Sequence, residues 1–501
     1  MRAIQEQPAR TSETEQAESL VPASQDFASF AGRWIHWALL VAVFGFLAVR
    51  AALQFTPHWD TMMYHLPSAL TLYGLTTYEP DPIIRGFLEG IPHGAHFVQG
   101  FLVLVSGRMS AANLINLTAL AISAITVWRM TRGTSALRWY LTALLAVPLV
   151  ILHADCSYID LWNGSFLATG FVFLVQLFRF VKRGSSAVTP VASVVGCLIA
   201  LGISFNSKYQ SWPFNVLLWG WLVVGLCLLW KRDAKIGRKA SLSAALLIPI
   251  FLVHPAKNAF LHGNPTHPIY NPLMAPESSK MLQNPSLEGS VRPQTPIALW
   301  GTPNSLRYAY SAFEINRLMP SKFPMIWSLD SGKGYPARNA TIHYRMGGWF
   351  FATVLILLVA IAFGLRTKVL DWMPVAIFAS CAALPSILTF SHALRYWLFI
   401  PIAASYLAAE AFAGFSRRVA MPFQIGLAGC AVFVCWTVLP PFTIDTAHPA
   451  DYAPENARKF WVARAANMDG RTIAVSAHPY SMFWAGPEFN TFKVREIRMK
   501  K

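Results

Sequence analysis

Long runs of apolar residues follow one another along most of the chain, with short polar stretches between them. A run of about 17 to 25 mainly apolar residues has the length that a helix needs to cross a membrane. The pattern predicts about eleven such helices, near residues 34–54, 110–130, 139–154, 158–180, 187–206, 211–230, 240–256, 346–365, 369–390, 396–415 and 420–440. Two of these runs are short, so we expect kinked or tilted helices there.

The polar segments outside the runs predict three parts. Residues 1–33 form a polar tail, residues 34–441 form the transmembrane domain, and residues 442–501 form a second tail. The first apolar run lies far from the N-terminus and is long enough to span, so we predict no cleavable signal peptide. The segment Arg471–Ala477 (RTIAVSA) reads as one strand. The expected fold is therefore an all-α polytopic membrane protein whose short C-terminal tail carries at least one strand.

Basic residues cluster after every second apolar run, and this pattern predicts how the protein is oriented in the membrane. The clusters are Arg129, Arg132 and Arg138; Lys182 and Arg183; Lys231, Arg232, Lys235, Arg238 and Lys239; Arg366 and Lys368; and Arg417 and Arg418. With a cytoplasmic N-terminus, every cluster lies in the cytoplasm, as the positive-inside rule requires. The loops 55–109 and 257–345, the turns near residues 155, 208 and 392, and the C-terminal tail then lie on the outer face.

Composition supports the membrane interpretation and excludes other classes. Hydrophobic residues make up 54% of the chain and charged residues only 13%, too few to cover a soluble protein of this length. The net charge of +17, from 41 basic and 24 acidic residues, is explained by the cytoplasmic loops, so we predict no nucleic-acid partner. The six cysteines contain no CxxC pair, and we interpret them as small core residues.

After the first run the chain reads QFTPHWDTMMYHLPSAL, which places a carboxylate among aromatic residues where the chain leaves the membrane. Thr56, with a proline after it, is a plausible helix cap. Asp60 would then begin a short helix, with Tyr64 one turn further on, His65 beside it, and Pro67 ending or kinking the helix. Asp60 could equally be a simple cap, since an acidic residue is favourable near a helix start.

Three motifs resemble those of bacterial multispanning glycosyltransferases of the GT-C superfamily, which includes protein O-mannosyltransferases and lipid A aminoarabinose transferases. WDTMMYHLPSA, Trp59–Ala69, is similar to a Trp-Asp-Ser-x-x-Tyr-His-Leu-Pro pattern, with Thr61 in place of Ser. GNPTHPIY, Gly263–Tyr270, and HALRYWLFIP, His392–Pro401, resemble the Gly-Asn-Pro-x-x-Pro and Arg-Tyr-x-x-x-x-Pro elements of the same group. The first motif is fairly specific, the other two are weak alone, and none covers the tail after about residue 442.

The resemblance implies a function and a location. The superfamily places a catalytic Asp in the first outer loop, and Asp60 occupies that position. Asp60 would be the general base of an inverting transfer from a polyprenyl-phosphate sugar to an acceptor hydroxyl on a glycan, lipid or protein. The expected location is the bacterial inner membrane, in contact with membrane lipids and with the site on the periplasmic side. Such a reaction needs a base near the nucleophile and cations near the departing phosphate.

Cations on the outer face are therefore candidate phosphate ligands. Lys208, in FNSKYQSW, and Arg395 lie in short outer turns, where the positive-inside rule disfavours charge. Snorkelling of the two side chains to lipid headgroups is the alternative. Further substrate-binding candidates are Tyr64, His65, Tyr209, Asn264, His392 and Tyr396. Cations in the larger loops are weaker candidates: Arg85, Arg108, Lys257, Arg307 and Arg345.

Two further acidic residues, Asp155 and Asp160 in HADCSYIDLWNGSF, share the predicted outer face. Members of the superfamily often carry a second acidic residue here, for substrate contact and sometimes for a metal, and Asp160 matches that form better. A helix cap is the alternative. His93 and His96 have the i, i+3 spacing of metal ligands, but no Cys or Glu completes a set. We predict no cofactor and leave a divalent metal open.

Two other functions remain open at this point. A transporter or flippase of a lipid-linked saccharide would need charged residues in the middle of spans, broken helices and internal repeats. Glu410 is the clearest mid-span charge, and no repeat is visible. An O-antigen ligase or polymerase would share an outer-face site but would be expected to rely on Arg and His in one large loop. The position of Asp60 favours the glycosyltransferase.

Overall fold

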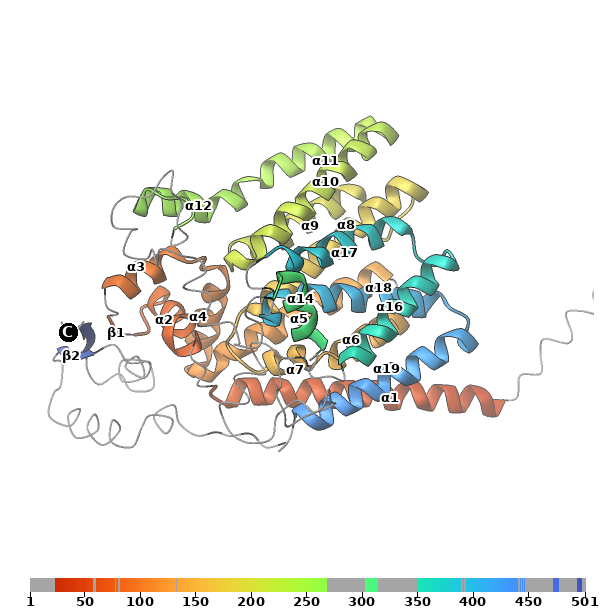
Figure 1. Ribbon diagram of the computed structural model, residues 1–501, viewed down its shortest axis with the longest axis horizontal. Coiled ribbons are helices and arrows are strands. Elements are labelled where there is room, and N and C mark those ends of the chain that lie inside the picture. The colour runs from red at the N-terminus through yellow and green to blue at the C-terminus, as the bar shows by residue number, and fades with distance from the viewer. Residues whose placement is uncertain are drawn as a thin grey trace, which may run out of the picture. The chain divides into compact units, whose positions relative to one another are not determined.

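The structure is a computed structural model of the chain (Figure 1). It describes residues 23–56, 60–76, 78–79, 82–131, 133–267, 302–313, 346, 350–388, 391, 393–439, 442, 444, 446, 472–476 and 493–497. The chain divides into two units, residues 1–46 and 47–501. Helix α1, Ala23–Leu53, begins in the first unit and ends in the second. Every contact described below lies within the second unit.

Each of the predicted apolar runs coincides with helix, so the prediction of a mainly helical, multi-pass membrane protein is confirmed. After α1, the helices in these runs are α5 Leu114–Thr131, α6 Thr134–Leu145, α7 Pro148–Ala154, α8 Asp160–Arg183, α9 Pro190–Phe205, α10 Trp212–Arg232, α11 Ala234–Leu247, α12 Pro249–His262, α16 Phe350–Arg366, α17 Trp372–Ala383, α18 Phe399–Gly414 and α19 Arg417–Val438. Short 3₁₀ segments and one further helix complete the bundle: η2 Met109–Asn113, η3 Tyr209–Ser211, α14 Asn304–Phe313, η7 Leu384–Ser386 and η8 Leu394–Trp397.

The number of spans stays a prediction. Among the described residues, seven helices are long and apolar enough to cross a membrane, or eight if the bent pair α6 and α7 is one span. The axes of that pair differ by 88°. Pro148 begins α7, and because proline lacks the N–H that would continue the α6 ladder, the predicted run 139–154 becomes two helices. Four shorter apolar helices, among them α9 and α16, complete the set.

Helix α8 lies at the centre of the bundle and packs against α5, α9, α10, α17 and α18. Its side chains are buried along most of its length. Asp160 is in its first turn and Lys182 and Arg183 are in its last, as the helix dipole favours. Gly184, with φ of +78°, ends the helix in the left-handed region. At about 1.5 Å per residue, the two ends of α8 lie some 35 Å apart.

One end of the bundle carries short helices from the first predicted outer loop. In Figure 1, α2 Leu66–Leu72, α3 Pro82–Gly90 and α4 Gly94–Ser106 gather beside α12. Helix α4 packs closely on α2 because Gly100 has no side chain: a Cβ there would lie 2.4 Å from the carbonyl oxygen of Ala69. Asn258 of α12 donates to the carbonyl of Gly90 over 2.8 Å. These contacts hold the loop helices against the bundle.

A small parallel sheet joins the first loop to the C-terminal segment. Its strand order is β1-β3-β2, with β1 Tyr78–Glu79, β3 Lys493–Ile497 and β2 Thr472–Ser476. In register, Tyr78 pairs with Val494, and Thr472 pairs with Lys493. Strand β2 lies in the segment that the sequence indicated as a strand. The pairing brings strands β2 and β3 to the end of the bundle that carries Asp60's loop.

Candidate active site

Asp60 begins a helical segment whose first turn is a π-helix, η1 Thr61–His65, followed directly by α2. Single π turns are rare and often mark functional sites. The helix does not end at Pro67, since Pro67 lies in the first turn of α2 and α2 continues to Leu72; that Pro67 kinks it stays a prediction. The hydroxyl of Thr56 donates to the carbonyl of Asp155 over 3.2 Å, so Thr56 is not the cap of this helix.

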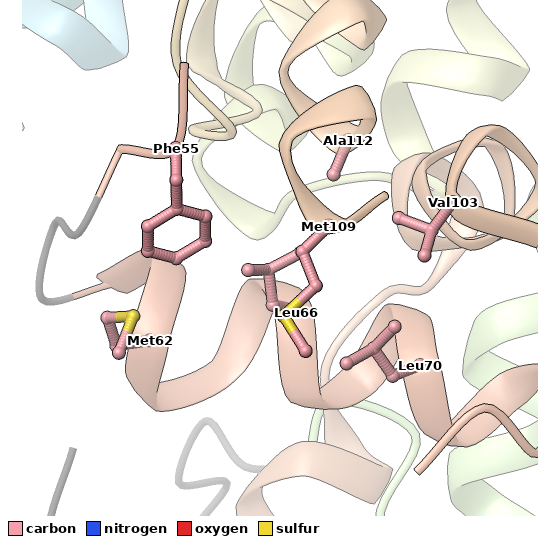
Figure 2. Packing of buried hydrophobic residues seen from close by; sticks show 7 residues of the cluster. All are labelled: Phe55, Met62, Leu66, Leu70, Val103, Met109 and Ala112. Atoms are coloured by element: carbon pink, nitrogen blue, oxygen red, sulfur yellow. The ribbon is translucent and has the colours of Figure 1, made fainter. Parts of the chain in front are cut away.

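The helix that carries Asp60 is held by an apolar cluster. Figure 2 shows its side chains converging from the end of α1, from η1 and α2, and from α4 and η2: Phe55, Met62, Leu66, Leu70, Val103, Met109 and Ala112. Each is at most 3% exposed. Burying such side chains stabilises by about 1.5–3 kcal/mol each for the larger ones, so the cluster fixes the orientation of η1.

Asp60 forms an ion pair with Arg395, although the two residues are 335 positions apart in the sequence. Arg395 Nη1 donates to Asp60 Oδ2 over 2.8 Å. Only 8% of the Arg395 side chain and 15% of the Asp60 side chain are exposed. Arg395 is carried by η8, between α17 and α18. The predicted convergence of these two residues is therefore present in the structure.

Two tyrosine rings surround the guanidinium of Arg395. Its Cζ atom lies 4.9 Å from the ring centroids of both Tyr158 and Tyr396, a distance at which a cation is attracted to an aromatic face. Nη2 also donates to the hydroxyl of Tyr396 over 3.1 Å. Burial raises the pKa of Tyr158, and the charge of Asp60 raises it further, so the phenol stays protonated.

The second predicted cation, Lys208, lies on the other side of Tyr396. Its Nζ atom is 5.0 Å from the centroid of the Tyr396 ring and donates to Asp160 Oδ1 over 2.6 Å. Burial lowers the pKa of Lys208, while the carboxylate of Asp160 raises it. Asp60, Arg395, Tyr396, Lys208 and Asp160 thus form one buried cluster, called the charge cluster below.

The close approach of two backbones brings the halves of the charge cluster together. Gly164 of α8 lies one turn after Asp160 and faces the start of α18, directly after Arg395's 3₁₀ segment. A Cβ on Gly164 would lie 2.9 Å from the amide nitrogen of Phe399. Only glycine allows this contact without a shift of backbone, so Gly164 sets the distance between the two ion pairs.

Three polar atoms in and beside the charge cluster have no hydrogen-bond partner among the described residues. They are Nε of Arg395, Oδ2 of Asp160 and Nε2 of His65, and each is buried. A buried polar atom without a partner costs about 1–3 kcal/mol, so such atoms are usually explained by a ligand or by water. One donor, one acceptor and one imidazole nitrogen are therefore available to a bound molecule.

His65 and Tyr64 lie next to the charge cluster. Their ring centroids are 4.1 Å apart, and the His65 ring is 5.8 Å from that of Tyr158. His65 is fully buried. Burial lowers the pKa of His65, and the nearby charge of Lys208 lowers it further, so the imidazole is neutral.

Other predicted substrate-binding residues lie in different surroundings and stay predictions. The hydroxyl of Tyr209 lies 2.7 Å from His254 Nε2 and also bonds to the carbonyls of Gly90 and His267. The side chain of Asn264 accepts bonds from the backbone and hydroxyl of Thr266. His392 lies outside the described residues.

Asp155 and Asp160 form ion pairs with different cations. Its Oδ2 atom lies 2.5 Å from Nε of Arg50, in the last turn of α1, and the two side chains are 4% and 6% exposed. Arg50 also donates to the carbonyl of Leu439 over 3.3 Å. The pair ties the end of α1, directly before Asp60's loop, to the turn between α7 and α8. The sequence did not single out Arg50, although it is a basic residue inside an apolar run.

Replacing Arg50 with methionine is expected to lower the stability of the folded protein by about 3–5 kcal/mol, because Asp155 would be left buried and unpaired. The measurement is the thermal midpoint of the purified protein in detergent. The double variant Arg50→Met, Asp155→Asn is expected to regain part of the loss. A single variant as stable as the wild type would contradict the importance of this pair.

An apolar cavity of about 190 Å³ adjoins η8. Leu394 and Trp397, the residues on either side of Arg395 and Tyr396, line it. The other walls come from Met346 and from α14, α16, α17 and α18. Among the described lining residues, only Tyr308 and Trp397 carry a polar side-chain atom. The cavity therefore offers an apolar chain a place directly beside the buried cation. For metal ions, the described part of the chain contains no group of three or more His, Cys, Asp or Glu side chains suited to hold one.

Comparison with known proteins identifies the fold. No protein-family model matches the chain, and no curated protein matches it at a significant level. Among solved structures, ArnT from Cupriavidus metallidurans bound to undecaprenyl phosphate matches 94% of this chain and 86% of its own, with 13% identity and a TM-score of 0.54. The same protein in its apo state matches 95% and 87%, with 15% identity and a TM-score of 0.51. The chain therefore has the multispanning fold of ArnT, and this likeness confirms, at the level of the fold, the resemblance that the motifs indicated.

Proposed function

We propose that the protein is a membrane glycosyltransferase that moves a sugar from a polyprenyl-phosphate donor to an acceptor hydroxyl, with Asp60 as general base. The reaction would take place at the periplasmic surface of a bacterial inner membrane. The observation that carries the proposal is the charge cluster: a carboxylate, two cations and a second carboxylate lie together at the end of the bundle, beside an apolar cavity.

Transfer proceeds by a single displacement at the anomeric carbon. Asp60 takes the proton of the acceptor hydroxyl as its oxygen forms a bond to that carbon. The bond from the anomeric carbon to the phosphate oxygen breaks on the opposite face, and its electron pair stays with the polyprenyl phosphate. The configuration at the anomeric carbon is inverted. A positioned base of this kind contributes about 10²–10⁴-fold to the rate.

Arg395 and Lys208 would bind the donor phosphate. Arg395 holds Asp60 through Nη1, while its buried Nε has no partner among the described residues and can donate to a phosphate oxygen. Lys208 has three N–H donors and uses one on Asp160. Charge-assisted bonds to phosphate are stronger in a buried site than in water. The same cations would stabilise the charge that develops on the leaving phosphate.

The donor's remaining parts also have places next to the charge cluster. The unpartnered Oδ2 of Asp160 can accept a bond from a sugar hydroxyl. The apolar cavity between Leu394, Trp397 and the helices around them can hold the first isoprene units of the lipid. Because the cavity lies beside Arg395, the phosphate of a lipid phosphate would bind at the cation and its isoprene chain would extend into the cavity. The structural neighbour ArnT is described as bound to undecaprenyl phosphate.

The test is sugar transfer in membranes that contain the protein. A radiolabelled mixture of polyprenyl-phosphate sugars is supplied, and the label is followed by its chemical form and by its side of the vesicle. Label in a new product, together with released polyprenyl phosphate, is the expected result. Label that crosses the vesicle membrane while still attached to its lipid would favour the transporter instead, and transfer between saccharide diphosphate lipids would favour a ligase or polymerase.

A further inference from the structure

Three histidines form a hydrogen-bonded chain that begins beside the charge cluster. His65 Nδ1 lies 3.0 Å from His96 Nε2, and His96 Nδ1 lies 3.3 Å from His93 Nδ1. His65 and His96 are 0% and 1% exposed, whereas His93 is half-buried. The sequence indicated His93 and His96 only as the first two members of an incomplete metal set, and no residue near them reveals their link to His65.

His93, the outer end of the histidine chain, lies at a second cavity. His93 lines a hollow of about 370 Å³ whose walls also include Arg85 and Glu89, two exposed residues of α3. The three imidazoles therefore connect a fully buried position to one that water can enter.

His65, the inner end of the histidine chain, lies beside the charge cluster. Its ring centroid is 5.8 Å from that of Tyr158, and the Tyr158 ring centroid is 4.9 Å from Cζ of Arg395. Arg395 in turn donates to Asp60. The histidine chain thus begins next to the residues that hold Asp60.

The hydrogen bonds among the three histidines allow two complementary proton arrangements. In the first, His93 donates to His96 and His96 donates to His65, which leaves an N–H at Nε2 of His65. In the second, His65 donates to His96 and His96 donates to His93, which leaves a lone pair at Nε2 of His65. In both arrangements this buried Nε2 has no partner among the described residues, so it is free to exchange a proton with a bound molecule.

We propose that His65, His96 and His93 form a relay that carries the proton released in sugar transfer from the buried site to the second cavity. This proposal rests on the proposed function, since Asp60 must lose the acceptor's proton before each new turnover. Water bound between the charge cluster and Nε2 of His65 passes the proton of Asp60 to that nitrogen. The proton on Nδ1 of His65 moves to His96, that on Nδ1 of His96 moves to His93, and the proton on Nε2 of His93 leaves to water. Each imidazole gains one proton and loses one, which leaves the three rings in the first arrangement. Rotation of the rings returns them to the second arrangement before the next proton enters.

The electrostatic surroundings suit a relay that does not retain the proton. Burial lowers the pKa of His65, as does the charge of Lys208. Burial and the charge of Lys257 lower the pKa of His93 to about 4. Both residues are therefore neutral at pH 7, and a proton that arrives at His93 is released to water.

The test compares two substitutions of His96 in full-length protein. His96→Ala leaves a space that free imidazole can enter, whereas His96→Gln fills the space with an amide that cannot relay a proton. We expect both to lower the transfer rate at least about tenfold, a modest share of the usual acid–base contribution. Added imidazole should restore His96→Ala and leave His96→Gln unchanged. His254→Ala, which opens a space beside Tyr209, is the matched control and should not respond to imidazole.

Each outcome separates the relay from the proposed function. Transfer by His96→Ala at the wild-type rate, or a slow His96→Ala that imidazole does not restore, would overturn the relay while sugar transfer itself stands. If His96→Ala does not fold, His93→Ala, at the half-buried end, replaces it and should show the same response to imidazole. Absence of transfer by the wild type would instead overturn the proposed function.

Discussion

Replacing Asp60 with asparagine is expected to lower the rate of sugar transfer at least about 100-fold, because the general base is lost. Asparagine has nearly the same shape and keeps an oxygen that can accept the bond from Arg395 Nη1. The loss should therefore appear in kcat. Because Arg395 also loses its counter-ion, we expect a fall in stability beside it, so the rate is compared per amount of folded protein. The measurement is transfer of labelled sugar in membranes, normalised to the protein recovered after detergent extraction.

Asp371→Asn is the matched control for this variant. Asp371 pairs with Lys182 and Arg183 at the cytoplasmic end predicted for α8, and its side chain is 10% exposed. The same substitution there removes an ion pair but lies a whole helix length from Asp60. Transfer should be retained in Asp371→Asn. Equal transfer by Asp60→Asn and the wild type would move the base elsewhere, and Asp160 would be tested next.

Replacing Lys208 with methionine is expected to have two separable effects. Transfer should fall by about 10²–10³-fold, the usual effect of removing one group that stabilises developing charge. Stability should also fall by about 3–5 kcal/mol, because Asp160 would be left buried without its cation. The first effect is measured by transfer at several donor concentrations, and the second by the thermal midpoint in detergent.

The double variant Lys208→Met, Asp160→Asn distinguishes the two effects. Removing both charges takes away the uncompensated carboxylate, so the thermal midpoint should return toward that of the wild type. Transfer should stay low, because the phosphate ligand is still missing. Recovery of transfer together with stability would mean that Lys208 acts only as the counter-ion of Asp160, and the phosphate would then depend on Arg395 alone.

The sequence predicts the helical regions well because membrane-spanning helices must be long and apolar. What it could not predict is where a run is interrupted. The run 139–154 bends at Pro148, and the run 240–256 is made of α11 and α12, divided at Pro249. In a soluble protein a proline usually ends a helix, whereas in a membrane bundle neighbouring helices can satisfy the freed backbone groups and the run continues.

The convergence of Asp60, Lys208 and Arg395 follows from the positive-inside rule together with the position of the motif. Three residues far apart in sequence were placed on one face, and the buried site brings them together. Charge on the side of the membrane that is predicted to be outside, where the positive-inside rule disfavours it, was the informative signal. It needs no knowledge of how the helices pack.

The sequence could not predict which cation pairs with Asp155 and which with Asp160. Both lie in one turn with the same predicted exposure, yet Asp155 pairs with Arg50 and Asp160 pairs with Lys208. Their partners come from α1 and from the turn after α9, so the choice depends on packing. The π turn at Asp60 and the ring of Tyr158 against Arg395 are likewise set by tertiary contacts.

The ion pair of Arg50 and Asp155 also has a consequence for the order of biosynthesis. Arg50 leaves the ribosome in the first helix, whereas Asp155 follows only after α4, α5, α6 and α7 have been made. Until then the pair with Asp155 cannot form, and a long basic side chain near the end of a span can reach the lipid headgroups. The end of α1, directly before the loop that carries Asp60, is thus tied to the bundle only when the turn before α8 has been made, and Asp60 itself gains its ion-pair partner only when Arg395 follows, after α17.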